Sequence, residues 1–193
     1  MHEDDLLRRW EEHWPACPPI AHALKSAYPD RWIRFHSLPE SKRYPDTANE
    51  YAIVLDRYNT ILDELFSDQV IYVITADWSQ TPRPAQRSRP PARWQPGGAQ
   101  YWTSICNDDP DPEYITYTHL YFGQTPWERG CLDELLHAVT DEVTAGVLIT
   151  DIALERIHHP YDGGSDVILT TTDERDRLRS HHAEWLSSHP LGL

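Results

Sequence analysis

Apolar residues recur every three or four positions in several stretches of the chain, which is the spacing of an amphipathic helix. The clearest stretch follows Pro45, where Thr47 and Glu50 form the pattern of a capping box and the apolar positions continue to Phe66. Four shorter stretches show the same spacing: residues 4–14, 20–27, 125–139 and 172–185. The pattern therefore predicts five helices.

Other stretches are rich in β-branched and aromatic residues, or alternate between apolar and polar side chains, as strands do. They are residues 31–38, 69–76, 100–106, 113–122, 146–158 and 166–170. Asp162 and Gly163 lie in a tight turn ahead of the last of them, where we expect positive backbone dihedrals. The combined order predicts an α+β fold with a mostly antiparallel sheet of five or six strands and helices packed mainly on one face.

Periodicity is lost over residues 79–99, which are rich in proline and arginine. We expect one domain over residues 1–193 with a long loop here, and a loop of this length is commonly functional or disordered. Its candidate partner-binding residues are Arg83, Arg87, Arg89, Arg93 and Trp94. They could contact an acidic partner or a phosphate, or the loop could fold back onto the acidic turn at residues 108–113.

The chain has 31 acidic and 17 basic residues, and therefore a formal net charge of −14. Four of the arginines lie in the loop, which contains no acid, so the rest of the chain carries −18. This balance argues against nucleic-acid binding, which needs clustered positive charge. The acidic N-terminus and the absence of a long apolar run predict a cytoplasmic protein with no membrane span.

The segment 31–44 has the densest collection of side chains suited to ligand binding. Arg34 and His36 are expected on one face of a strand, and Ser41, Lys42 and Arg43 follow before a helix begins. Together with Tyr161, Asp162 and Asp166 of the later turn, they are the candidate ligand-binding residues for a carboxylate or phosphate. The alternative is that the arginines only pair with the acids of an acidic protein.

Two pairs of adjacent histidines, His158-His159 and His181-His182, suggest metal binding. Neighbouring side chains on a strand point to opposite faces, so each pair would supply only one ligand to a site. The sequence therefore predicts no metal site. It also assigns no cofactor and no catalytic residue.

Two segments resemble an uncharacterised bacterial family, a domain of unknown function. The first is the strand Trp32–Phe35 with the helix that follows it. The second is the turn and strand Tyr161–Ile168, followed by a helix that ends at Glu184–Leu186. The resemblance implies a shared fold and a bacterial origin, and it implies no activity.

The leading hypothesis is a non-catalytic binding protein, of the immunity type, for a cationic protein partner, because an acidic and aromatic surface suits such a partner. The alternative is a small enzyme or anion-binding protein whose site is formed by residues 34–43 and 161–166. A third possibility is a scaffolding domain with an exposed apolar interface. The sequence does not determine the oligomeric state.

Overall fold

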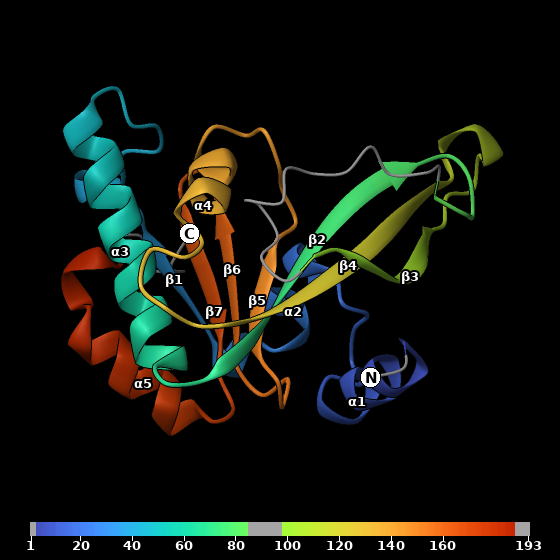
Figure 1. The fold of residues 1–193 in the computed structure, drawn as a ribbon, viewed down its shortest axis with the longest axis horizontal. Coiled ribbons are helices and arrows are strands. Elements are labelled where there is room, and N and C mark those ends of the chain that lie inside the picture. The colour runs from blue at the N-terminus through green and yellow to red at the C-terminus, as the bar shows by residue number, and fades with distance from the viewer. Residues whose placement is uncertain (1–2, 85–97, 188–193) are drawn as a thin grey trace.

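The computed structural model describes residues 3–84 and 98–187. The described strands form one seven-stranded sheet in the order β1-β7-β6-β5-β2-β4-β3, and every neighbouring pair is antiparallel (Figure 1). The helices are α1 (Glu3–His13), α2 (Ala21–Ala27), α3 (Ala48–Phe66), α4 (Asp133–Thr140) and α5 (Thr172–His181). The strands are β1 (Trp32–His36), β2 (Val70–Ser79), β3 (Gln100–Asn107), β4 (Thr116–Pro126), β5 (Leu148–Asp151), β6 (Ile157–Tyr161) and β7 (Gly164–Ile168). The predicted α+β class and antiparallel sheet are confirmed.

Helices cover both faces of the sheet. Along β2, Ile71 and Val73 belong to a core with α3, α4 and α5, whereas Tyr72 and Ile74 belong to a second core with α1 and α2. The alternation follows from the strand period of two, because successive side chains point to opposite faces. The expectation that helices pack mainly on one face is therefore right for three helices and wrong for the first two.

The central helix α3 begins at the predicted capping box. The Thr47 hydroxyl accepts a hydrogen bond from the Glu50 backbone N–H (3.2 Å), and the Glu50 carboxylate accepts one from the Thr47 N–H (3.2 Å). The helix then buries one face, which includes Val54, Tyr58 and Leu62. Two otherwise unpaired N–H groups are satisfied in this way at the start of the helix, which fixes where it begins.

The sheet has one strand more than the upper prediction of six. Residues 146–158, expected as a single strand, contain all of β5 and the first two residues of β6. The chain turns between them at Leu154, which has a positive φ of 62° and donates its N–H to the Asp151 carbonyl (3.1 Å). A leucine gives no sequence signal for such a backbone conformation, which normally favours glycine.

The fourth helix begins later than the sequence predicts. Thr125 and Pro126 were expected to start it, but they pair with Ile71 and Val70 as the end of β4. The helix starts only at Asp133. The ten-residue pairing of β4 with β2 overrides a local pattern that is typical of a helix start.

The hairpin between β6 and β7 depends on glycine for space. Neither Asp162 nor Gly163 has the positive φ that the sequence predicted for this turn. A Cβ atom on Gly164 would instead overlap the carbonyl oxygen of Phe35 on β1. The glycine is therefore needed because the backbone of β1 lies directly against β7, where Gly164 pairs with His36.

Strands β2, β4 and β3 extend beyond the helical layer to the connection between β3 and β4, at the right of Figure 1. The predicted loop lies between Ser79 of β2 and Gln100 of β3, and its residues 85–97 fall outside the described part of the chain. Among the helices described, none combines the length and the apolar character needed to span a membrane.

We predict that Gly164→Ala destabilises the protein by about 3 kcal/mol, the upper end of the usual overpacking cost, because the new methyl group meets backbone that cannot yield easily. Urea unfolding measures this change in the free energy of unfolding. The matched control is Gly163→Ala, whose Cβ would meet the side chain of exposed Arg43 at 3.1 Å. Equal losses for the two variants would contradict the account.

Candidate functional site

The two segments that supply the candidate ligand-binding residues lie side by side. Strand β1 carries Arg34 and His36, and it pairs with β7, where Arg34 lies opposite Asp166. Tyr161 is the last residue of β6, and Asp162 lies in the turn between β6 and β7. The sheet order therefore brings together residues that are more than a hundred positions apart in the chain.

Arg34 and Asp166 form a bidentate ion pair. The guanidinium Nε and Nη2 donate to the two carboxylate oxygens at 2.7 and 2.9 Å. The Arg34 guanidinium also lies 5.0 Å from the ring centroid of Tyr161 and 5.4 Å from that of Trp32. The hydrogen bond to Asp166 raises the pKa of Arg34, so the guanidinium stays charged. Two parallel hydrogen bonds between charged groups are the geometry of an ion pair that stabilises the fold.

Lys42 and Arg43 of the segment also contact carboxylates. Arg43 Nε donates to Asp162 at 2.5 Å, and Lys42 Nζ lies 2.5 Å from Glu50 Oε1 and 2.8 Å from an Asp46 oxygen. Ser41, the last candidate here, is exposed and has a positive φ of 57°. The sequence left open that the arginines only pair with acids. This alternative describes the contacts of Arg34 and Arg43.

His36 contributes a half-buried imidazole to this region. Its Nε2 has no hydrogen-bond partner among the described residues. Burial lowers the pKa of His36, and the positive charges of Arg34 and Arg57 lower it further. Both effects favour the neutral ring over the charged one. Arg57 donates to the His36 carbonyl oxygen at 2.8 Å, which ties α3 to the end of β1.

The hairpin turn is tied to α3 through Tyr58. Its hydroxyl lies 2.6 Å from the Tyr161 carbonyl oxygen and 3.1 Å from that of Gly164. Burial raises the pKa of both Tyr58 and Tyr161, so each phenol stays protonated. Sequence patterns placed Tyr58 on the apolar face of a helix but gave no signal that its hydroxyl would bond to the turn.

His158 packs edge-on against the Tyr58 ring, with centroids 5.9 Å apart. Both of its ring nitrogens are buried and have no partner among the described residues. Its neighbour His159 instead hydrogen-bonds through Nδ1 to the Val147 carbonyl (2.9 Å). Burial lowers the pKa of His158 to about 3.

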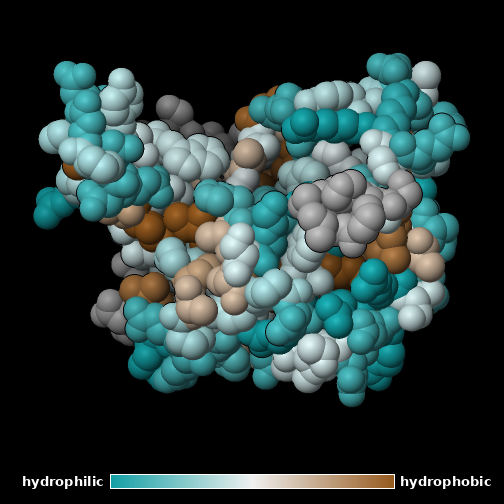
Figure 2. Space-filling view, turned by 180° about the vertical axis from the view of Figure 1, so that it is seen from behind, coloured by the Kyte–Doolittle hydropathy of each residue, from teal (hydrophilic) through white to brown (hydrophobic). Residues whose placement is uncertain are grey.

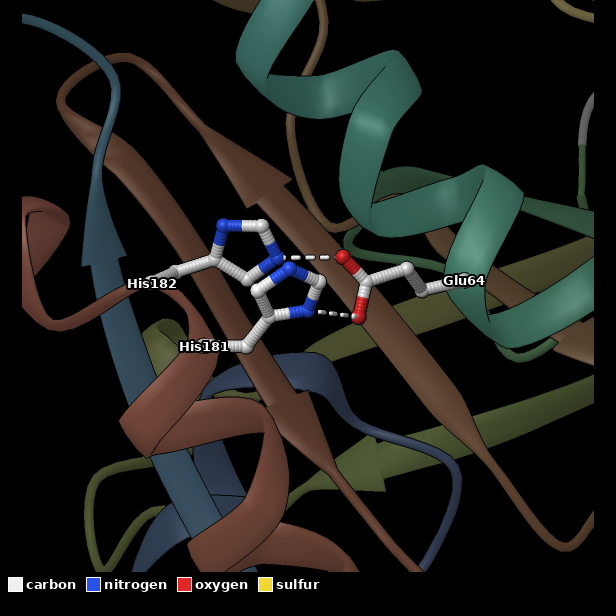
Figure 3. A group of neighbouring side chains, drawn as sticks. All are labelled: Glu64, His181 and His182. Atoms are coloured by element: carbon white, nitrogen blue, oxygen red, sulfur yellow. Dashed lines mark hydrogen bonds and ion pairs between the residues drawn. The ribbon is translucent and has the colours of Figure 1, made fainter.

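The second histidine pair behaves differently from the prediction. His181 is the last residue of α5 and His182 is its C-cap, so neither lies on a strand. Their rings stack, with centroids 4.6 Å apart, and both reach the carboxylate of Glu64 near the end of α3 (Figure 3). The expectation that adjacent histidines diverge is therefore wrong for this pair.

An acidic tip connects β3 and β4. We use this name for Asp108, Asp109, Asp111, Glu113 and Tyr114. Backbone N–H groups of the turn donate to Asp109 (2.9 Å) and Asp111 (3.1 Å). Tyr114 is 67% exposed. Seen from behind, the projecting end of the long strands, at the upper left of Figure 2, has a mostly hydrophilic surface.

The candidate partner-binding residues of the arginine-rich loop are described only in part. Arg83 is exposed at its beginning, close to the end of β2. Arg87, Arg89, Arg93 and Trp94 lie outside the described residues.

Comparison with known proteins relates the chain to one protein family. A family model described as a domain of unknown function (DUF3885) matches residues 20–190. The match confirms the resemblance to an uncharacterised family that the sequence motifs predicted. Neither the curated proteins nor the solved structures contain a significant match.

We predict that His158 makes stability depend on pH. The folded protein keeps this histidine neutral down to about pH 3, whereas the unfolded chain protonates it near 6.5. Between these pH values the unfolded state therefore binds up to one proton more than the folded state. The free energy of unfolding then decreases as the pH is lowered, by up to about 1.4 kcal/mol per pH unit. The loss between pH 7 and pH 5 is about 2 kcal/mol.

Urea titrations at several pH values measure this slope. His158→Leu removes the titrating group, so its slope should be shallower whatever its stability at pH 7. His13→Leu, at an exposed histidine, is the control and should keep the wild-type slope. An unchanged slope in His158→Leu would rule out the buried neutral imidazole.

Proposed function

The chain belongs to the DUF3885 family of unknown function, and from this premise we propose that it is a non-catalytic binding protein of the bacterial cytoplasm, of the immunity type, for a cationic protein partner. The single observation that carries the proposal is the exposed Tyr114 among the four carboxylates of the acidic tip. Charge steers a partner of opposite sign, and tyrosine is a frequent anchor in interfaces.

The distribution of ion pairs supports this choice of surface. In the part of the chain that the structure describes, the ion pairs that arginine and lysine side chains form are with carboxylates outside the tip. Arg34 and Arg43, for example, are held by Asp166 and Asp162. None of these pairs uses a carboxylate of the tip, so the negative charge of the tip is available to a basic partner.

A second exposed aromatic side chain lies on the same projecting strands. Trp78 of β2 is 55% exposed. The end of β2 lies beside the tip, because the Gln80 side chain donates to the Glu113 carbonyl at 3.5 Å. A partner at the tip would therefore find apolar contact area beside the negative charges, and both contribute to a specific interface.

The alternative proposal is a small enzyme or anion-binding protein that uses the residues of segments 34–43 and 161–166. The adjacency of β1 and β7 favours it. The pairing of Arg34 with Asp166 and of Arg43 with Asp162 counts against it, because an incoming anion would have to displace a carboxylate already in place.

The test is a quantitative capture experiment with the full chain as bait in lysate of its native host at physiological salt, followed by identification of the bound protein. We expect a partner rich in lysine and arginine, whose binding weakens as salt rises. The tip variant replaces Asp108 and Asp111 by Asn, Glu113 by Gln and Tyr114 by Ala. It should bind that partner at least about tenfold more weakly, as expected for loss of a hot-spot side chain.

The control variant removes the same number of charges at exposed acids elsewhere, through Glu11→Gln, Asp30→Asn and Glu128→Gln. It should keep most of the affinity. Failure to recover any basic partner, or equal binding by the tip variant and the wild type, would overturn the proposal.

A further inference from the structure

We propose that Glu64, His181 and His182 form a binding site for a divalent transition-metal ion of the Zn²⁺ class. The proposal goes beyond the binding of a protein partner and does not depend on it. Each residue offers one ligand atom, and these three atoms lie within 4.8 Å of one another. They come from the last turn of α3 and from the C-terminal end of α5 (Figure 3).

The spacing of the three atoms suits a metal ion. His182 Nε2 lies 2.5 Å from one Glu64 oxygen, and His181 Nδ1 lies 3.2 Å from the other. Zinc binds imidazole nitrogen and carboxylate oxygen at about 2.0–2.2 Å, which places the ligand atoms of a tetrahedral site roughly 3.4 Å apart. The two Glu64–histidine contacts therefore differ from that separation by about 1 Å or less.

The donor types select the class of metal. Two of the three donors are imidazole nitrogens, which suit zinc and related transition metals. Magnesium and calcium take oxygen ligands, so this set does not fit them. Two histidines and one carboxylate are also a known ligand combination of zinc sites that keep a fourth position open.

Packing holds His182 in place. Its side chain is 6% exposed, its ring stacks on Trp185 with centroids 4.2 Å apart, and it meets the edge of Phe35 at 5.8 Å. A ligand whose orientation is fixed in this way loses little freedom when it binds a metal. This burial separates the cluster from a chance meeting of flexible surface side chains.

The other side of the cluster is open to solvent. The His181 side chain is 69% exposed, and both His181 and Glu64 line a hollow of about 370 Å³ between α3 and α5. Glu174 and Arg156, which line the same hollow, form an ion pair at 2.6 Å. Their charges therefore offset each other. The open side leaves space for a water molecule or another small ligand as the fourth donor.

The test is a calorimetric titration of Zn²⁺ into the full chain, prepared without a polyhistidine tag and freed of metal by chelation. We expect one Zn²⁺ per chain. Glu64→Gln and His181→Ala each remove one ligand and should weaken binding by about 100-fold, at least the effect known for outer-shell residues. Both changes are at side chains with access to solvent, and circular dichroism checks that the variants fold.

The matched control is His137→Ala, which removes a half-exposed histidine that contacts a carboxylate, Asp141, at 3.0 Å elsewhere on the surface. It should bind Zn²⁺ as the wild type does. Co²⁺ gives a second measurement on the unmodified chain, since a four-coordinate Co²⁺ ion with nitrogen ligands has a strong visible absorption. Absence of stoichiometric Zn²⁺ binding, or binding that survives both ligand substitutions, would overturn the proposal.

Discussion

The hydroxyl group of Tyr58 connects the elements on which the rest of this structure depends. It lies within hydrogen-bonding distance of two carbonyl oxygens, one on each side of the β6–β7 turn, and the tyrosine is 1% exposed. In such a dry environment a carbonyl oxygen without a donor is costly, so this contact fixes α3 relative to the hairpin. The position of α3 in turn sets where Glu64 meets the end of α5.

The same region explains why the basic residues of an acidic protein do not form an obvious anion site. Strand β1 packs so closely on β7 that only glycine fits at position 164. The register that follows places Arg34 opposite Asp166, and Arg43 reaches Asp162. Positive charge is thus used to stabilise the hairpin, and the acidic tip is a charged surface with an exposed aromatic side chain.

The sequence predicted the parts of the fold that depend on local chemistry. The capping box at Thr47 located the start of α3, and the Asp162-Gly163 turn located the last hairpin. The amphipathic pattern of a helix shows which of its sides is buried. It does not show which face of the sheet that side packs against. The placement of α1 and α2 on the second face therefore required the structure.

In the candidate sites, too, the sequence identified the residues but not the contacts between them. Sequence patterns selected Arg34 and Asp166, but the ion pair between them depends on strand register. The convergence of His181 and His182 on Glu64 was missed because the rule for neighbouring side chains was applied to a strand, whereas the pair ends a helix. The exposure of Tyr114 depends on how far the long strands project, which no local pattern encodes.

The most direct test of this account is amide hydrogen exchange on Tyr58→Phe, which removes only the hydroxyl. The control is Tyr51→Phe on the same helix, which loses an exposed hydrogen bond to Asp141 (2.7 Å). We expect Tyr58→Phe to lose about 1–3 kcal/mol of stability, with faster exchange centred on β7 and β1, and the control to change little. Unchanged protection of the hairpin in Tyr58→Phe would contradict the central role of this hydroxyl.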